Sequence, residues 1–153
     1  NAYEYVRDEI THSWDVRAEV VSKTASEVLQ NGTGICWVKS CLLAALLRGN
    51  KIPCGITYQK ITRADDSSDG YIIHALNTVY ISSLKKWIRL DARGNKATVH
   101  AEFCIEQEKL AYPVRPQFSE VDYFDNNVDL DERLVKILNE VDVVMNIHTD
   151  FEM

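Results

Sequence analysis

Long apolar runs and clusters of lysine or arginine are both missing from this sequence. A membrane-spanning helix needs roughly 20 consecutive apolar residues, and no stretch here approaches that length. The net charge is −6 at pH 7, so a surface that binds nucleic acid would have to form against the overall negative charge. We therefore expect neither a membrane nor a nucleic acid as a partner.

The N-terminal segment also lacks the features of a secretory signal. Its first ten residues, NAYEYVRDEI, contain neither the basic segment nor the apolar segment that such a signal carries. We therefore expect a cytoplasmic protein.

Closely spaced cysteine pairs are absent as well. The four cysteines, Cys36, Cys41, Cys54 and Cys104, include no CxxC pair, and a domain of this size does not need disulfides for stability. We therefore expect four free thiols. A zinc site at His100 and Cys104 would need two more ligands, so we expect no metal and no other cofactor.

What the chain does have is enough apolar residues for one hydrophobic core. It contains 153 residues, of which 46% are apolar, and this is typical of one ordinary domain. No internal repeat or low-complexity linker divides the sequence. We therefore expect a single domain over residues 1–153.

Apolar residues at helical spacing predict four helices. They cover residues 3–10, about 16–30, Thr33 or Gly34 to the RGN sequence at 48–50, and about 129–141. Asparagine and glycine after the second helix are typical of a helix end. The third helix has a wide leucine-rich face, so we expect it to be the most buried.

After Pro53 the apolar pattern changes to a period of two, which indicates strands. The segments CGITYQKI, YIIHALNTVYI and WIRLD are separated by the polar loop RADDSSDG and the turn SSLKK. This arrangement predicts an antiparallel meander. Residues 96 to 126 include Pro113 and Pro116 and favour irregular structure. The chain as a whole predicts an α+β fold.

Two cysteines near the start of the third helix differ in their surroundings. Five helical positions separate Cys36 from Cys41 by about 140° around the axis, so the two thiols cannot face the same environment. Cys41 lies among leucines and is interpreted as core packing. Cys36 lies in the first turn, where free backbone N–H groups and the helix dipole stabilise a thiolate. Cys36 is therefore the candidate nucleophile.

A nucleophilic thiol needs a base, and His74 lies within a strongly patterned strand. If Tyr80 pairs with Trp87 across the following turn, His74 lies diagonally across from Asp91 on the same face of the sheet. A shift of one residue would place them on opposite faces. With that register, Asp91 can orient the imidazole of His74. A histidine on an apolar strand is also often a core residue, and this alternative stays open.

Three sequence motifs resemble those of the transglutaminase-like superfamily. They are TGICWVKSCLLAALLRGNKIPCGITYQ, DGYIIHALNTVYI and KKWIRLDARGNK, in that order. The resemblance covers about residues 16–96 and leaves a family-specific tail at about 97–153. It implies a papain-like core, with the cysteine-bearing helix packed on an antiparallel sheet. It also implies Cys36 as nucleophile, His74 as base and Asp91 as the residue that orients the base.

Some positions depart from the pattern of the family. Ser40 replaces a common alanine, Leu76 replaces a frequent tryptophan, and Ala92 and Arg93 replace a frequent Pro-Thr pair. None of these departures removes one of the three chemical groups. They do leave the substrate preference open.

The chemistry implied by the resemblance is acyl transfer or hydrolysis at an amide bond, through a thioacyl intermediate. The substrate would be a peptide or a small amide, as in bacterial proteases and amidases with this short core. The oxyanion would bind the backbone N–H of Cys36 and, by analogy with papain-type enzymes, the side chain of Gln30. Gln30 is equally compatible with a solvent-facing helix position. Trp14 and Trp37 are candidates for the cleft wall, although tryptophan is more often packed in a core.

Two other functions remain open at this stage. The fold could serve as a catalytically idle binding module, or Cys36 could act as a redox sensor with Cys54 as its resolving partner. We expect the segment EKLAYPVRP, residues 108–116, to cross near the site or to cap the sheet.

Overall fold

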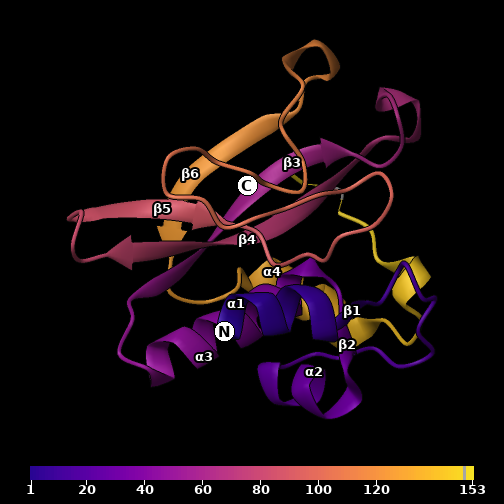
Figure 1. Ribbon diagram of the computed structural model, residues 1–153. Coiled ribbons are helices and arrows are strands. Elements are labelled where there is room, and N and C mark those ends of the chain that lie inside the picture. The colour runs from indigo at the N-terminus through magenta and orange to yellow at the C-terminus, as the bar shows by residue number, and fades with distance from the viewer. Residues whose placement is uncertain (150) are drawn as a thin grey trace.

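The structure is a computed structural model that describes residues 1–149 and 151–153. Short helices at the N-terminus are followed by a long central helix, by the strands of an antiparallel sheet and by a last helix (Figure 1). In chain order they are α1 (Ala2–Glu4), a π-helical segment (Tyr5–Glu9), β1 (Thr11–His12), α2 (Ala25–Asn31), β2 (Thr33–Gly34), α3 (Cys36–Gly49), β3 (Cys54–Thr62), β4 (Tyr71–Ile81), β5 (Lys86–Leu90), β6 (Val121–Asn127) and α4 (Glu132–Glu140). Short 3-10 turns lie at Ser67–Asp69, Pro116–Phe118 and Val144–Asn146.

The main sheet has four strands in the order β5-β4-β3-β6, and each neighbouring pair is antiparallel. A second, two-stranded sheet joins β1 to β2 in parallel. The strands alternate with polar turns as the period-two pattern predicted, and the α+β fold with a helix packed on an antiparallel sheet is confirmed.

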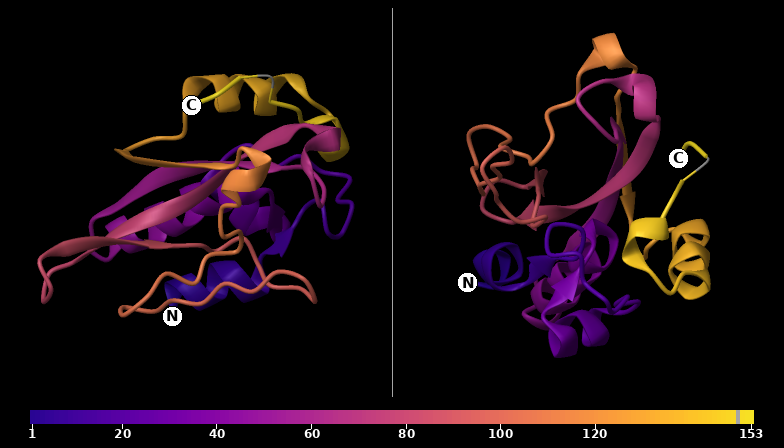
Figure 2. Two further views of the ribbon diagram at one scale, coloured as in Figure 1. Left: turned by 90° about the horizontal axis from the view of Figure 1, so that it is seen from above. Right: turned by 90° about the vertical axis from the view of Figure 1, so that its right-hand side faces the viewer.

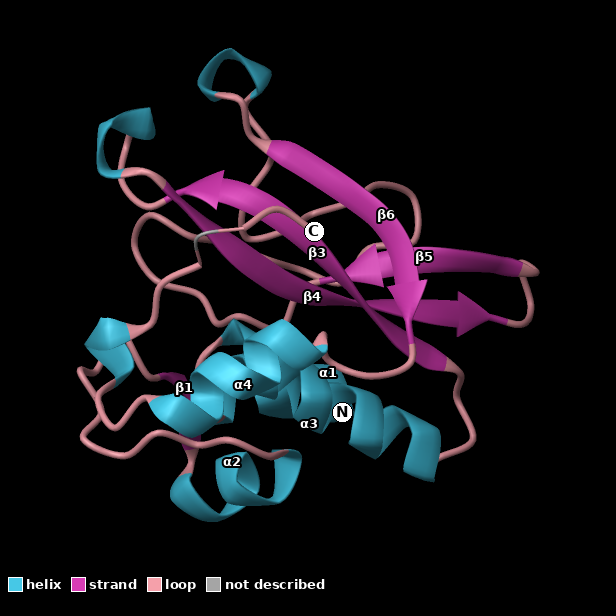
Figure 3. Ribbon diagram, turned by 180° about the vertical axis from the view of Figure 1, so that it is seen from behind, coloured by secondary structure: helices cyan, strands magenta, loops and turns pink. Residues whose placement is uncertain are grey.

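The central helix α3 packs against β4 and β3, the two inner strands of the main sheet. Seen from behind in Figure 3, α4 lies in front of α3 and below the strands. The right-hand view of Figure 2 shows the N-terminal helix on one side of the sheet and α4 with the C-terminus on the other. One hydrophobic cluster joins these layers and includes the fully buried side chains Trp37, Leu43, Ile56, Leu134 and Leu138.

Three predicted helix starts are wrong, and one of them is that of α4, which begins at Glu132 rather than near residue 129. The second helix begins at Ala25 rather than near residue 16, because the Thr24 side chain caps it by accepting a hydrogen bond from the backbone N–H of Glu27. Its end at Gly32 is confirmed, and this glycine has the positive φ of 67° that favours glycine at a helix end. The third helix begins at Cys36 because Thr33 and Gly34 pair with β1.

The strand register agrees with the prediction. Tyr80 pairs with Trp87, and Asn77 pairs with Leu90. The strand β6 was not predicted, because its edge position leaves most of its side chains exposed and without an alternating apolar pattern.

No helix in the described part of the chain has the length and apolar character needed to span a membrane.

Candidate active site

Cys36 occupies the first position of the central helix α3. The chain enters this helix through the extended residue Ile35, directly after β2. A Cβ atom at Gly34 would lie 2.9 Å from methyl groups of both Val28 and Val38, so a glycine is needed where α2 and α3 approach each other. This close approach fixes where α3 begins and therefore where the Cys36 thiol lies. Only 8% of Cys36 is exposed.

His74 and Asp91 meet across the hairpin formed by β4 and β5. The Nε2 atom of His74 lies 2.8 Å from Oδ2 of Asp91, and both side chains are buried. This contact follows from the predicted register, in which His74 is a diagonal neighbour of the residue directly after β5. Since Nε2 is engaged by the carboxylate, Nδ1 is the ring nitrogen left for another partner.

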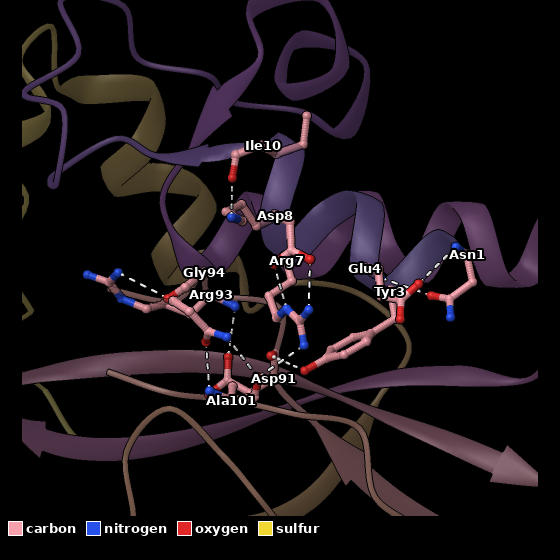
Figure 4. A network of polar contacts seen from close by, with 12 residues as sticks. Asn1, Tyr3, Glu4, Arg7, Asp8, Ile10, Asp91, Arg93, Gly94 and Ala101 are labelled. Carbon is pink, nitrogen blue, oxygen red and sulfur yellow. Dashed lines mark hydrogen bonds and ion pairs between the residues drawn. The ribbon is translucent and has the colours of Figure 1, made fainter. Parts of the chain in front are cut away.

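Four donors hold Asp91, three of them at its carboxylate and one at its main-chain oxygen. Its Oδ2 atom also accepts the backbone N–H of Ala111 at 3.1 Å, and Oδ1 accepts the backbone N–H of Arg93 at 3.0 Å. The Tyr3 hydroxyl donates to the main-chain oxygen of Asp91 at 3.1 Å (Figure 4). Burial raises the pKa of Asp91, but the charge of His74 and these hydrogen bonds lower it below its usual value.

The surroundings of His74 favour the charged form of its ring. Burial lowers the pKa of His74, but the charges of Asp91 and Cys36 and hydrogen bonds to both side chains raise it to about 10. The imidazolium is thus held between an anionic carboxylate and the thiol group. A cation beside a thiol is an arrangement that favours the reactive thiolate form.

Cys36 and His74 border a cavity of about 580 Å³. Such a volume lies within the range of small-molecule and peptide-side-chain sites, roughly 300–1,000 Å³. Its lining includes Cys36, His74, His12, Trp14, Arg93 and Tyr112. The cavity therefore gives a ligand access to the thiol and to the imidazole.

The segment after β5 completes the wall of the cavity. The ring of Tyr112 meets the His74 ring edge to face, with centroids 5.0 Å apart. The Gln59 side chain of β3 donates to the main-chain oxygen of Tyr112 at 3.0 Å, which ties this segment to the sheet. The expectation that residues 108–116 cross near the site is confirmed.

The structure does not bring every sequence-predicted residue to the cavity. Gln30 is exposed on α2 and is not part of the lining, so its placement does not support it as an oxyanion donor. Trp14 and Trp37 both line the cavity. Trp37 is also fully buried and donates from its indole N–H to the main-chain oxygen of Ile73 at 2.8 Å.

Two polar residues of the cavity were not foreseen. His12 accepts the backbone N–H of Cys36 at 3.2 Å. Arg93 is buried and forms a two-pronged ion pair with Asp15, whose Oδ1 atom lies 2.8 Å from one guanidinium nitrogen. The two-residue strand β1 is too short to show a period that would mark His12. Arg93 lies three residues after the end of β5, close to Asp91, and this is the signal that could have pointed to it.

Two of the other cysteines, Cys41 and Cys54, are poorly suited to nucleophilic chemistry. All four cysteines are free. Burial raises the pKa of Cys41 and of Cys54 to about 11 each, which keeps both protonated at neutral pH.

Among the residues that the structure describes, no three His, Cys, Asp or Glu side chains gather in a way that could hold a metal ion.

The sequence and the structure were compared with those of known proteins. The crystal structure of a candidate cysteine protease from Cytophaga hutchinsonii is 22% identical, with a TM-score of 0.47, and the match covers 60% of this chain and 29% of that protein. No curated protein matches the chain. The family model of the transglutaminase-like superfamily matches residues 1–92, which include Cys36, His74 and Asp91. The chain therefore belongs to the transglutaminase-like superfamily.

Proposed function

We propose that this protein transfers or hydrolyses an acyl group at an amide bond through Cys36, His74 and Asp91. The observation that carries this proposal is the position of His74, whose imidazolium lies between Asp91 and the thiol at the wall of a cavity. Membership of the superfamily supports a cysteine-dependent hydrolase or acyltransferase. The cavity volume is suited to a peptide or a small amide.

The reaction would proceed in two half-reactions. The Cys36 thiolate attacks the acyl carbon, so that an S–C bond forms and the carbonyl electron pair moves onto oxygen. The C–N bond then breaks, and the proton of His74 passes to the leaving amine. Water or a second amine attacks the thioester and gives its proton to His74. The S–C bond breaks and the thiolate is restored.

Asp91 acts in this scheme by holding His74 rather than by accepting its proton. Its carboxylate accepts hydrogen bonds from His74, Arg93 and Ala111. This fixes the ring with Nε2 turned away from the thiol and stabilises the imidazolium.

The first test is the rate at which iodoacetamide alkylates each cysteine at pH 6, read by peptide mass spectrometry. We expect Cys36 to react at least tenfold faster than half-buried Cys104, because His74 lies beside Cys36 and can activate it as a nucleophile. Cys41 and Cys54 serve as internal references, since their raised pKa values keep them protonated. The same measurement in His74→Gln should remove the difference between Cys36 and Cys104.

The second test asks whether the reactive thiol forms an acyl-enzyme. Wild-type protein is treated with 4-nitrophenyl acetate, and acetylated Cys36 is sought by mass spectrometry before and after addition of an amine. Release of the acetyl group by water indicates a hydrolase, and its transfer to the amine indicates a transferase. An unreactive Cys36, or one whose reactivity does not depend on His74, would overturn the proposal in favour of an idle binding module.

A further inference from the structure

The wall of the cavity beside Cys36 carries an excess of positive charge. Its lysine and arginine side chains are Arg63, Arg93, Lys96 and Arg115. Its carboxylates are Asp15, Asp65 and Glu120. Such an excess runs against the net charge of −6 of the whole chain. Which of these cations can bind a ligand depends on how far its partners in the protein already neutralise it.

Arg115 is neutralised within the protein. Its Nη2 atom lies 2.8 Å from Oε1 of Glu120, and its Nη1 atom donates to the main-chain oxygen of Asp65 at 2.8 Å. The ion pair of Arg115 with Glu120 therefore has no net charge to offer a ligand. The side chain of Asp65 is exposed, so the solvent screens its charge.

Asp15 is shared by two cations. Arg93 binds both of its carboxylate oxygen atoms, and Oδ1 of Asp15 also lies 3.0 Å from Nζ of Lys96. Lys96 is the more accessible of the two cations, since 44% of its side chain is exposed. One carboxylate thus faces two positive charges, and this group of three side chains keeps a net positive charge.

Arg63 lies beside no carboxylate in the described part of the chain. Its guanidinium forms one hydrogen bond there, from Nη1 to Nδ1 of His148 at 2.8 Å. Its Cζ atom lies 5.8 Å from the centroid of the Trp14 ring. The backbone N–H of Arg63 donates to the main-chain oxygen of Gly70 at 3.0 Å, which ties the residue to the hairpin of β3 and β4. Because a guanidinium has five N–H groups, most of those of Arg63 can donate to a ligand.

Trp14 fixes the position of Arg63 relative to the thiol. Its indole N–H donates to the main-chain oxygen of Val144 at 3.1 Å. On the side away from Arg63, the Trp14 ring meets the His12 ring edge to face, with centroids 6.3 Å apart. Nε2 of His12 in turn accepts the backbone N–H of Cys36 at 3.2 Å. A row of contacts along one wall of the cavity therefore joins the guanidinium to the start of α3.

We propose that Arg63 binds a carboxylate of the acyl donor, so that the substrate is an acidic peptide or another amide with a carboxylate in its acyl part. This inference rests on the acyl-transfer function proposed above. A carboxylate matches the planar guanidinium with two parallel hydrogen bonds. Lys96 adds to the attraction, because Asp15 neutralises only one of its two cations.

The position of His74 indicates which part of the substrate carries the carboxylate. The leaving amine must face His74, because His74 supplies its proton. Arg63 instead reaches the thiol through Trp14 and His12. The carboxylate therefore belongs to the acyl part, which stays on Cys36 until the second half-reaction.

The test compares charged and neutral acyl donors of the same length. The charged donors are the mono-4-nitrophenyl esters of adipic and suberic acid, and the neutral donors are their methyl esters. The release of 4-nitrophenol gives the rate, and mass spectrometry identifies acylated Cys36. In the wild type we expect the better of the two acids to react about tenfold faster than its methyl ester, as for a hydrogen bond between charged groups.

Variants of Arg63 show whether this residue causes the preference. In Arg63→Gln the acid should lose its advantage, whereas the rate of its methyl ester and the alkylation rate with iodoacetamide should not change. Arg63→Lys keeps the charge without the planar fork and should retain part of the preference. Exposed Arg17→Gln makes the same change in net charge outside the cavity and is the matched control. Thermal unfolding shows whether each variant is folded.

The outcomes separate this inference from the proposed function. Equal rates for acid and methyl ester in the wild type would overturn the inference and leave acyl transfer untouched. A preference that persists in Arg63→Gln would also overturn it, as would an equal slowing of acid and methyl ester in that variant, because Arg63 would then only support the fold. Failure of every ester to acylate Cys36 in the wild type would overturn the proposed function itself.

Discussion

The Nε2 atom of His74 lies 2.8 Å from Oδ2 of Asp91, although the two residues are 17 positions apart in the chain. The turn between β4 and β5 sets this distance, because it pairs Tyr80 with Trp87 and thereby fixes the side of the sheet on which each residue lies. A shift of the hairpin by one residue would separate the pair. The turn therefore determines the chemistry of the cavity.

Replacing Asp91 with asparagine should slow acylation of Cys36 by about 10²–10⁴-fold, the range seen when an orienting aspartate is replaced. The amide of the variant offers one acceptor oxygen to the three donors at this site and turns its NH₂ group either toward His74 and Ala111 or toward the backbone N–H of Arg93. The acetylation rate with 4-nitrophenyl acetate measures the effect. Exposed Asp142→Asn is the matched control. An unchanged rate in D91N would show that His74 does not need its carboxylate.

The raised pKa of His74 predicts how stability depends on pH. The folded protein keeps the proton up to about pH 10, whereas the unfolded chain releases it near the ordinary value of 6.5. The stabilisation is therefore complete below pH 6.5 and is lost as the pH rises toward 10. Between pH 6.5 and 8, the unfolding free energy of wild type should fall relative to His74→Gln, by up to about 1.4 kcal/mol per pH unit.

Urea unfolding of both proteins at several pH values measures this difference. The range stops at pH 8 because Lys39 contributes with the opposite sign above it. Burial lowers the pKa of Lys39 to about 8, so the folded protein releases this proton first and gains stability as the pH rises further. Parallel curves for the two proteins below pH 8 would contradict a charged His74.

Replacing Ala111 with proline removes the backbone N–H that Asp91 accepts. A buried carboxylate oxygen that loses a donor should cost about 1–3 kcal/mol of stability, and the acetylation rate should fall because Asp91 is less firmly held. Ala111→Gly keeps the N–H and is the control. Chemical denaturation and the acetylation assay measure the two effects. Equal behaviour of the two variants would mean that this contact does not support the site.

Replacing Trp37 with phenylalanine should destabilise the fold. The indole N–H donates to the main-chain oxygen of Ile73 in a fully buried position, so the variant leaves a buried carbonyl without its donor. This loss should cost about 1–3 kcal/mol in urea unfolding. Trp87→Phe, on a side chain that is 46% exposed, should change stability much less. A similar small change for both would assign Trp37 a minor role in the core.

Much of the central region could be predicted because its signals are local. The alternating pattern predicted β3, β4 and β5. The short turn after β4 left two possible registers, which differ by one residue and place side chains on opposite faces of the sheet. One of these registers brings His74 to Asp91. The position of Cys36 followed from its place at the start of an apolar helix. The single domain over residues 1–153 and the roles of these three residues stay predictions.

The sequence did not predict the contacts that depend on the backbone or on very short elements, because such contacts produce no periodic pattern of side chains. Ala111 contributes a backbone N–H, which any residue except proline would supply. His12 lies in a strand of two residues, too short for a periodic signal. Gln30 was expected at the cavity by analogy, but α2 starts later than predicted and presents this residue to solvent.

The contact between Ala111 and Asp91 also bears on how the protein is made. During synthesis Cys36, His74 and Asp91 leave the ribosome before residues 111 and 112, and before the strand β6 that closes the sheet beside β3. A nascent chain that ends before this segment already carries all three chemical groups, but the carboxylate lacks a donor and the imidazole lacks the cover of Tyr112. The thiol therefore acquires its ordered surroundings only after residues 111–127 have been synthesised and have folded back over the hairpin.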